Sequence, residues 1–157
     1  MATPKYVRLP QVREKAFPDL LRTGYKVTSN EDQFQNCFGY AAGETTGWWT
    51  PIAGNGYQWP AELPRKTDVD TFAAFYKLKG GYVPCDTGKL EADFEKVVLY
   101  VDSNNEVSHA ALQKEDGTWT SKLGVWEDIE HNIPEGLNGD DPAYGKVAKF
   151  LKRPRKK

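Results

Sequence analysis

Residues 36–43 read Asn-Cys-Phe-Gly-Tyr-Ala-Ala-Gly, and they decide the fold because they place a cysteine where a helix begins. The aromatic and small residues that follow Cys37 can hold such a helix against a sheet. A thiol at the N-terminus of a helix lies at the positive end of the helix dipole, which favours thiolate and prepares a nucleophile. The alternative is that Cys37 is a small buried apolar residue, as most free cysteines are.

The composition indicates one soluble globular domain over residues 1–157. A chain of 157 residues can bury a substantial core, and 39% hydrophobic and 27% charged residues are ordinary values for such a domain. The net charge of −1 gives no general attraction to nucleic acid or membrane. The exception is the basic run at residues 152–157, which we expect to be a disordered tail, with a phosphate contact or a targeting signal as the minority interpretation.

The sequence favours a cytoplasmic protein with reduced thiols. No apolar run reaches the length of a membrane-spanning helix, and the first residues lack the apolar core of a secretory signal. Two cysteines do not make a disulfide framework. Export without such a signal stays open, and the sequence does not indicate an oligomeric state.

The order of expected elements is typical of the α+β class. After an extended lead-in at residues 1–12, we predict a short helix within 12–21, a brief strand at 25–28, the Cys37 helix, and a clear helix that Thr67 caps and Gly80-Gly81 ends. Strands follow at 96–101, 107–112, 119–123 and 144–151, with a short helix at 125–131. The strands predict an antiparallel meander.

Residues 47–60 form an unusual loop, because four large rings occur among glycine, proline and asparagine. These rings are Trp48, Trp49, Tyr57 and Trp59. One interpretation is a long loop that its aromatic residues anchor to the core. The other is the wall of a substrate-binding cleft beside Cys37, with the four rings as candidate binding residues.

A cysteine nucleophile needs a base, and the chain has only His109 and His131. Strand alternation predicts that His109 shares a face with Val107 and Ala111, while the neighbouring Ser108 and Ala110 point the other way. If this strand packs under the Cys37 helix, the imidazole can take the thiol proton and deliver it to a leaving group. On the following strand, Ser121 is the first candidate for the group that orients the imidazole.

These motifs resemble those of papain-like cysteine peptidases. Residues 36–42 are similar to their nucleophile helix, and the later order of His109, Trp119, 121–124, His131 and 144–145 resembles compact domains of the NlpC type. The chain is also similar, from about residue 36 to 153, to an uncharacterised bacterial domain family with a Cys-to-His arrangement. The resemblance implies a nucleophile-bearing helix packed on an antiparallel β-sheet, with Cys37 as nucleophile and His109 as base.

The chain departs from the papain-like pattern at two positions. The third catalytic residue is usually asparagine, aspartate, glutamine or histidine, whereas this strand offers Ser121 or Lys122; His131 is an alternative. Serine accepts a hydrogen bond but does not stabilise imidazolium as a carboxylate does. No glutamine has the spacing of the papain oxyanion residue, which leaves Gln33, Gln35 or the Cys37 N–H.

The resulting prediction is a thiol hydrolase or amidase without a cofactor, acting on a peptide, protein or other amide-containing substrate through an acyl-thioenzyme. A deamidase or transglutaminase shares the first half of this reaction. A further alternative is a catalytically inactive papain-like module that binds a partner through loop 47–60. A zinc site made of Cys37, Cys85, His109 and His131 has suitable ligand types but lacks a close ligand pair, so we expect no metal.

Overall fold

The computed structural model describes residues 8–30, 35–44, 47–124, 126–140 and 143–155. Seven strands form one sheet in the order β1-β6-β5-β4-β3-β7-β2, and all neighbouring pairs are antiparallel. With the helices this confirms the α+β class. The elements are α1 (Gln11–Glu14), α2 (Leu20–Thr23), β1 (Tyr25–Ser29), α3 (Cys37–Ala41), α4 (Val69–Gly80), β2 (Val83–Cys85), β3 (Phe94–Val101), β4 (Val107–Gln113), β5 (Trp119–Lys122), β6 (Asp128–His131), the 3₁₀ helix η1 (Pro134–Leu137) and β7 (Lys146–Pro154).

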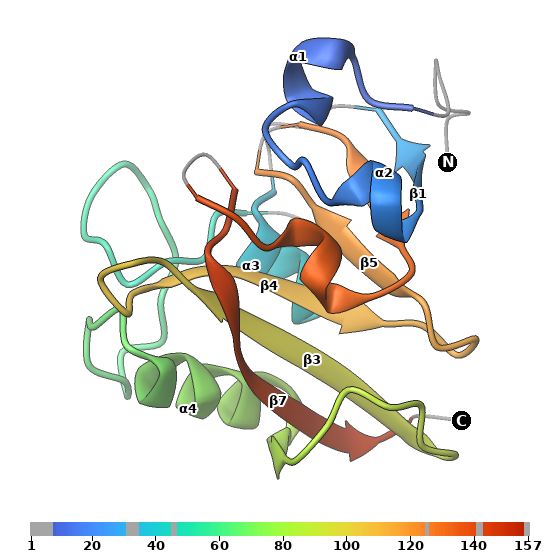
Figure 1. Ribbon diagram of the computed structural model, residues 1–157. Helices are drawn as coiled ribbons and strands as arrows, with labels where there is room; N and C mark the ends of the chain where they lie inside the picture. Colours follow the sequence, from blue (N-terminus) through green and yellow to red (C-terminus); the bar gives the residue numbers. More distant parts are fainter. Residues whose placement is uncertain (1–7, 31–34, 45–46, 125, 141–142, 156–157) are drawn as a thin grey trace.

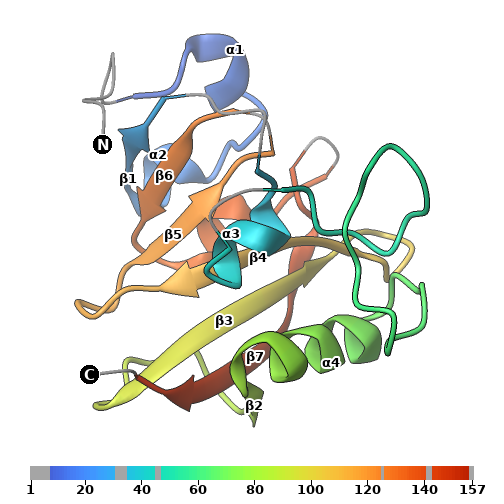
Figure 2. The same ribbon diagram turned by 180° about the vertical axis from the view of Figure 1, so that it is seen from behind.

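Helices cover both faces of the sheet. α1, α2 and η1 lie on one face, and α3 and α4 lie on the other, as Figures 1 and 2 show from opposite sides. β3 separates two hydrophobic clusters because its alternate side chains point to opposite faces. Val97 and Leu99 pack in the cluster of Cys37 and α4, whereas Val98 and Tyr100 pack in the cluster of Phe17 and α2. The α3–α4 layer is joined by a buried hydrogen bond of 3.0 Å from Tyr76 Oη to the Phe38 carbonyl.

The long helix and the consecutive strands β3, β4 and β5 agree with the sequence predictions, with corrections at their ends. The last strand does not extend the predicted meander, because β7 pairs with β3 and β2. Asp68, not Thr67, caps α4, since its side chain accepts a hydrogen bond from the Thr71 N–H at 3.1 Å. Gly81 ends the helix in the left-handed region, at φ 75°. The short helix expected at 125–131 is wrong within the described residues: 128–131 form β6, which pairs with both β1 and β5, while Val125 lies outside them.

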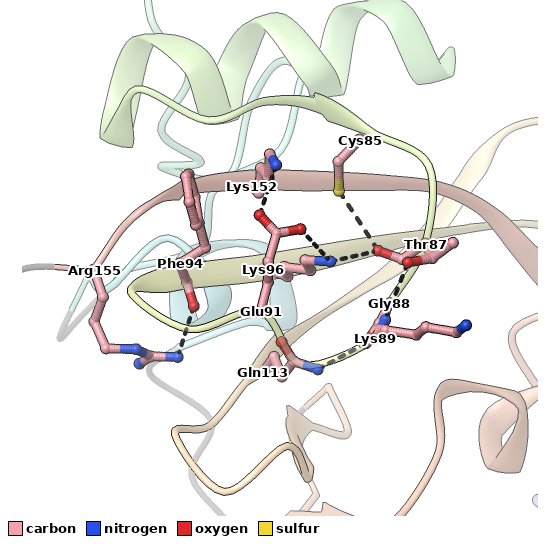
Figure 3. A network of polar contacts seen from close by, with 10 residues as sticks. All are labelled: Cys85, Thr87, Gly88, Lys89, Glu91, Phe94, Lys96, Gln113, Lys152 and Arg155. Carbon is pink, nitrogen blue, oxygen red and sulfur yellow. Dashed lines mark hydrogen bonds and ion pairs between the residues drawn. The ribbon is translucent and has the colours of Figure 1, made fainter.

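The terminal predictions also need correction. Residue 11 begins α1, so the extended lead-in does not reach residue 12. The basic tail is ordered as far as residue 155, because β7 continues to Pro154 between β3 and β2. Acidic partners hold it there. Lys152 Nζ bonds Glu91 Oε2 at 2.7 Å (Figure 3), and Arg153 Nη2 bonds Glu95 Oε1 at 2.7 Å. Residues 156–157 lie outside the described part of the chain.

Gly145 sets the position of the segment that enters β7. Its φ is +86°, and a Cβ there would lie 2.0 Å from the Val101 carbonyl oxygen. We therefore expect Gly145→Ala to destabilise the protein by more than about 3 kcal/mol, which urea unfolding will measure. Gly43 is the matched control, since its φ is +83° but no atom lies within 4 Å of the added Cβ. Gly43→Ala should cost only about 1 kcal/mol, and equal losses would contradict the role of the close approach.

Candidate functional site

Cys37 is the first residue of α3, as the sequence predicts. The Asn36 side chain caps this helix by accepting a hydrogen bond from the Gly39 N–H at 3.1 Å. The same side chain also accepts from the Trp49 N–H at 3.1 Å and donates to the Trp49 carbonyl at 2.8 Å. Asn36 thereby joins the start of the nucleophile helix to the aromatic loop 47–60.

Burial raises the pKa of the Cys37 thiol, whereas its place at a helix N-terminus predicted a lowered pKa. The residue is only 6% exposed, and desolvation raises the pKa of its thiol to about 12. The backbone N–H groups of Ala110, Cys37 and Phe38 oppose this effect, because each lowers the thiol pKa. The prediction that the helix N-terminus favours thiolate is therefore wrong for this five-residue helix. At neutral pH the resting group is a thiol.

His109 lies on β4, but a β-bulge changes its neighbours on the sheet. Tyr100 pairs with His109 and Val101 pairs with Val107, so Ser108 is an extra residue between them. Val107 consequently packs on the α3 face, and the prediction that it shares a face with His109 is wrong. The imidazole points to the other face, where its ring lies parallel to that of Tyr144, with centroids 4.0 Å apart at 2°.

Ser121 and His131, the two candidates for the group that orients the imidazole, form a chain of contacts with it. Ser121 contacts His109, and His131 contacts Ser121. His109 Nε2 lies 3.0 Å from Ser121 Oγ, and Ser121 Oγ lies 2.8 Å from His131 Nε2. His131 Nδ1 lies 3.0 Å from the Ile133 carbonyl. All three side chains are completely buried. Ser121 and His131 were alternatives in the sequence, and the fold makes them consecutive members of one chain, the His109–Ser121–His131 relay.

The hydrogen bonds of this relay define where its protons lie. A carbonyl only accepts, so His131 Nδ1 carries hydrogen, and burial lowers the pKa of His131 to about 4, which leaves Nε2 as an acceptor at neutral pH. Ser121 therefore donates to His131 and accepts from His109 Nε2–H. Burial also holds the pKa of His109 well below its usual value. His109 Nδ1 is thus an unprotonated lone pair.

This nitrogen has no hydrogen-bond partner among the described residues, although it is buried. An unsatisfied buried acceptor costs about 1–3 kcal/mol, so such an atom calls for a functional explanation. Its two properties, a free lone pair and a fixed tautomer, are those of a general base.

Cys37 packs in the cluster on the α3 face, whereas the His109 imidazole points to the other face, and the two side chains share no hydrogen bond in the described structure. β4 pairs with β5 only at Leu112 and Gln113, so the two strands separate toward residue 109. The Cys37 sulfur lies at this separation, near enough to the Ala110 N–H for that group to lower the thiol pKa. The thiol therefore contacts the backbone of the residue next to His109.

A pocket of about 250 Å³ lies over Cys37, and its lining residues are all uncharged. Phe38, Ile52 and Tyr144 contribute to its apolar walls together with two rings of loop 47–60. These are Trp48 and Tyr57, which stack at 6.2 Å. Ser108 and Thr50 add hydroxyl groups.

The four aromatic candidates of loop 47–60 have two different roles. Trp48 and Tyr57 line the Cys37 pocket. Trp59 is buried in the core, where it stacks on Phe75 at 4.8 Å, and Trp49 packs on the same ring at 6.0 Å. Trp49 and Trp59 thus anchor the loop to the core, and Trp48 and Tyr57 form a wall of the pocket at Cys37, while substrate binding by these rings stays a prediction.

Sequence reasoning did not assign a role to Tyr144, which touches both halves of the site. Its ring lies on His109, and it lines the pocket with Cys37. The only sequence signal was its place in the Tyr-Gly pair before the last strand, where a ring would normally be interpreted as core.

The second cysteine lies away from this site. Cys85 is on β2, the edge strand of the sheet, and its thiol donates to the Thr87 carbonyl at 3.6 Å. Lys96 Nζ donates to the same carbonyl oxygen at 2.9 Å (Figure 3). Within the described ranges, no three histidine, cysteine or acidic side chains are grouped so as to hold a metal ion. Nor does any helix in these ranges have the length and apolar character needed to cross a membrane.

Comparison with known proteins gives one match. A family model described as a domain of unknown function, DUF7689, covers residues 26–152, from the start of β1 into β7. The matched segment contains Cys37, the relay residues and Tyr144. No curated protein and no solved structure matches the chain.

Proposed function

The chain belongs to the DUF7689 family, a domain family of unknown function, and we propose from its own side chains that it is a thiol hydrolase or amidase of papain-like type. Cys37 is the nucleophile, His109 is the base and acid, and Ser121 with His131 orients the imidazole. The observation that carries the proposal is His109 Nδ1: a buried lone pair without a partner among the described residues, in a tautomer set by two further side chains. Tyr144 connects it to the nucleophile, because its ring stacks on the imidazole and lines the pocket over Cys37.

The first step is a general-base reaction of neutral groups, since the thiol pKa is about 12 and the imidazole is unprotonated. As the sulfur bonds to the carbonyl carbon, the thiol proton moves to His109 Nδ1 and the carbonyl π electrons move to oxygen. This transfer needs Sγ and Nδ1 to approach one another when substrate binds, because catalytic hydrogen bonds often form only in that complex.

Collapse of the tetrahedral intermediate completes acyl transfer. The carbon–nitrogen bond of an amide breaks, and its nitrogen takes the proton from Nδ1. Water then gives a proton to Nδ1 and attacks the thioester carbon, and the sulfur leaves and recovers the proton. An amine in place of water gives transamidation, and a glutamine side chain as substrate gives deamidation, so the resolving nucleophile distinguishes these outcomes.

The pocket favours an uncharged acyl group. Its lining residues carry no charge, and a charged group would lose hydration there without a paired ion. Trp48 and Tyr57 offer aromatic surface for an apolar or planar substituent.

The test uses p-nitrophenyl acetate and locates the acetyl group by mass spectrometry. We expect Cys37 to be acetylated and then deacetylated, with a rate constant that is nearly constant from about pH 6 to pH 9, because the base is unprotonated throughout. Cys37→Ala should abolish the reaction and Cys85→Ser should leave it unchanged. A rate that rises tenfold per pH unit would show an unassisted thiol and contradict the proposal.

Binding without chemistry is a second candidate function. It is favoured by one observation, the absence of a hydrogen bond between the thiol and the imidazole in the described structure, together with the high thiol pKa. In this case the aromatic pocket would hold an apolar group of a partner. The same experiment separates the two functions, because a binding module leaves Cys37 unacetylated.

A further inference from the structure

Attack on a carbonyl requires a hydrogen-bond donor for the oxyanion that forms, and the amide side chains that the structure describes near this site already donate to other acceptors. Gln35 Nε2 donates to the Glu44 carbonyl. Gln33 lies outside the described residues. The Cys37 N–H lowers the pKa of the Cys37 thiol. The Asn36 amide in the pocket wall donates to the Trp49 carbonyl.

Tyr144 brings a hydroxyl to this position. Its ring lies parallel on the His109 imidazole at 4.0 Å, and the same residue lines the pocket over Cys37. It therefore contacts the base and faces the nucleophile. No hydrogen bond joins Tyr144 Oη to another residue of the described chain, so the hydroxyl is free to donate to a bound ligand.

The backbone of Tyr144 is held on both sides, which keeps the ring in place. The Ser108 hydroxyl donates to the Tyr144 carbonyl at 2.5 Å, and the Tyr144 N–H donates to the Leu137 carbonyl at 3.2 Å. Gly139 and Gly145 exchange two hydrogen bonds of 2.8 Å. A donor fixed before substrate binds stabilises developing charge without the cost of reorganisation.

We infer that the Tyr144 hydroxyl donates a hydrogen bond to the oxyanion formed when Cys37 attacks a carbonyl, and so acts as a catalytic residue of the reaction proposed above. The inference rests on that proposed function. It extends the site beyond the cysteine, the histidine and the relay to a residue that enters from the opposite end of the chain.

The ionisation of the phenol agrees with a donor role. Burial, and the nearby Cys37 when it is charged, hold the pKa of Tyr144 well above its usual value. The hydroxyl therefore keeps its proton across the range in which the imidazole is a base.

The experiment compares two reactions of Cys37, of which only one forms an oxyanion. Acetylation by p-nitrophenyl acetate passes through a tetrahedral oxyanion, whereas alkylation by iodoacetamide is a direct displacement at carbon. Tyr144→Phe keeps the ring on His109 and removes the hydroxyl. We expect it to slow acetylation by about 10²-fold and to change alkylation by less than about twofold. Tyr82→Phe removes a tyrosine hydroxyl outside this pocket, one that donates to Glu95 Oε1 at 3.0 Å, and should change neither rate.

Each other outcome has a definite meaning. Equal losses in acetylation and alkylation would mean that Tyr144 positions the base or the thiol, and no loss would mean that it does not contact the oxyanion; both overturn the inference. An equal loss in Tyr82→Phe would mean that removing a tyrosine hydroxyl acts through the stability of the protein and not through the oxyanion, which also overturns the inference. If wild-type Cys37 is not acetylated faster than Cys85, the proposed function itself fails and this inference fails with it.

Discussion

Replacing His109 with alanine is expected to slow acetylation of Cys37 by about 10²- to 10⁴-fold at pH 7. The reason is that burial keeps the thiol protonated, with a pKa of about 12, so the reaction depends on a base that removes its proton. The pH profile should also change, from nearly constant to a rise of about tenfold per pH unit, because only the rare thiolate would then react. The measurement is the second-order rate constant with p-nitrophenyl acetate between about pH 6 and pH 9.

Ser121→Ala tests whether the relay orients this base. Without the serine, His109 Nε2–H has no acceptor and the imidazole no longer has a fixed tautomer. We expect an intermediate loss of about 10- to 10²-fold, as is common for residues that orient a functional group. Thr120→Val is the matched control, since Thr120 is adjacent but bonds Tyr40 Oη on the α3 face at 2.6 Å. If Thr120→Val and Ser121→Ala have the same effect, the relay is not specific.

The second large effect is a loss of stability at mildly acidic pH. His131 has a pKa of about 4 in the folded protein, against about 6.5 in an unfolded chain. Above pH 6.5 neither state binds the proton, and below that value the unfolded state binds it first, so the free energy of unfolding falls as pH falls. His131 alone accounts for about 2 kcal/mol between pH 7 and pH 5 and about 3 kcal/mol by pH 4. His109, also neutral because of burial, adds to the loss in the same direction.

Urea unfolding at pH 7, 6 and 5 measures this dependence. Carboxylates with lowered pKa values, such as Glu14 and Asp68, lose their contributions below about pH 4.5 and therefore fall outside the window. The control is His131→Gln, which keeps a donor and an acceptor at the site. Its stability should depend less on pH by about 2 kcal/mol over the same range, whatever its stability at pH 7. An identical dependence in both proteins would assign the effect to other groups.

Local sequence signals predicted those elements whose structure depends on near neighbours. The apolar run at 96–101 and the Asp-Gly turn before Trp119 predicted consecutive antiparallel strands. The stretch 36–43 predicted a helix that begins at Cys37, which the capping hydrogen bond of Asn36 confirms. The segment at 125–131 failed, because residues 128–131 are fixed as a strand by pairing with β1 and β5. Such pairing joins distant parts of the chain and leaves little local pattern.

By itself, the sequence determined the α+β class and most residue types of the site: one cysteine at a helix start, and a histidine and a serine on consecutive strands. That His131 lies on a strand came only from the structure. Tertiary structure decided how these groups relate. The Ser108 bulge turned His109 away from the α3 face, packing raised rather than lowered the Cys37 pKa, and the fold brought Tyr144 onto the imidazole. The physical reason is that residue type and spacing set local geometry. Burial and the contacts between distant segments set the pKa of the thiol, the tautomer of the imidazole and which side chains of the site meet.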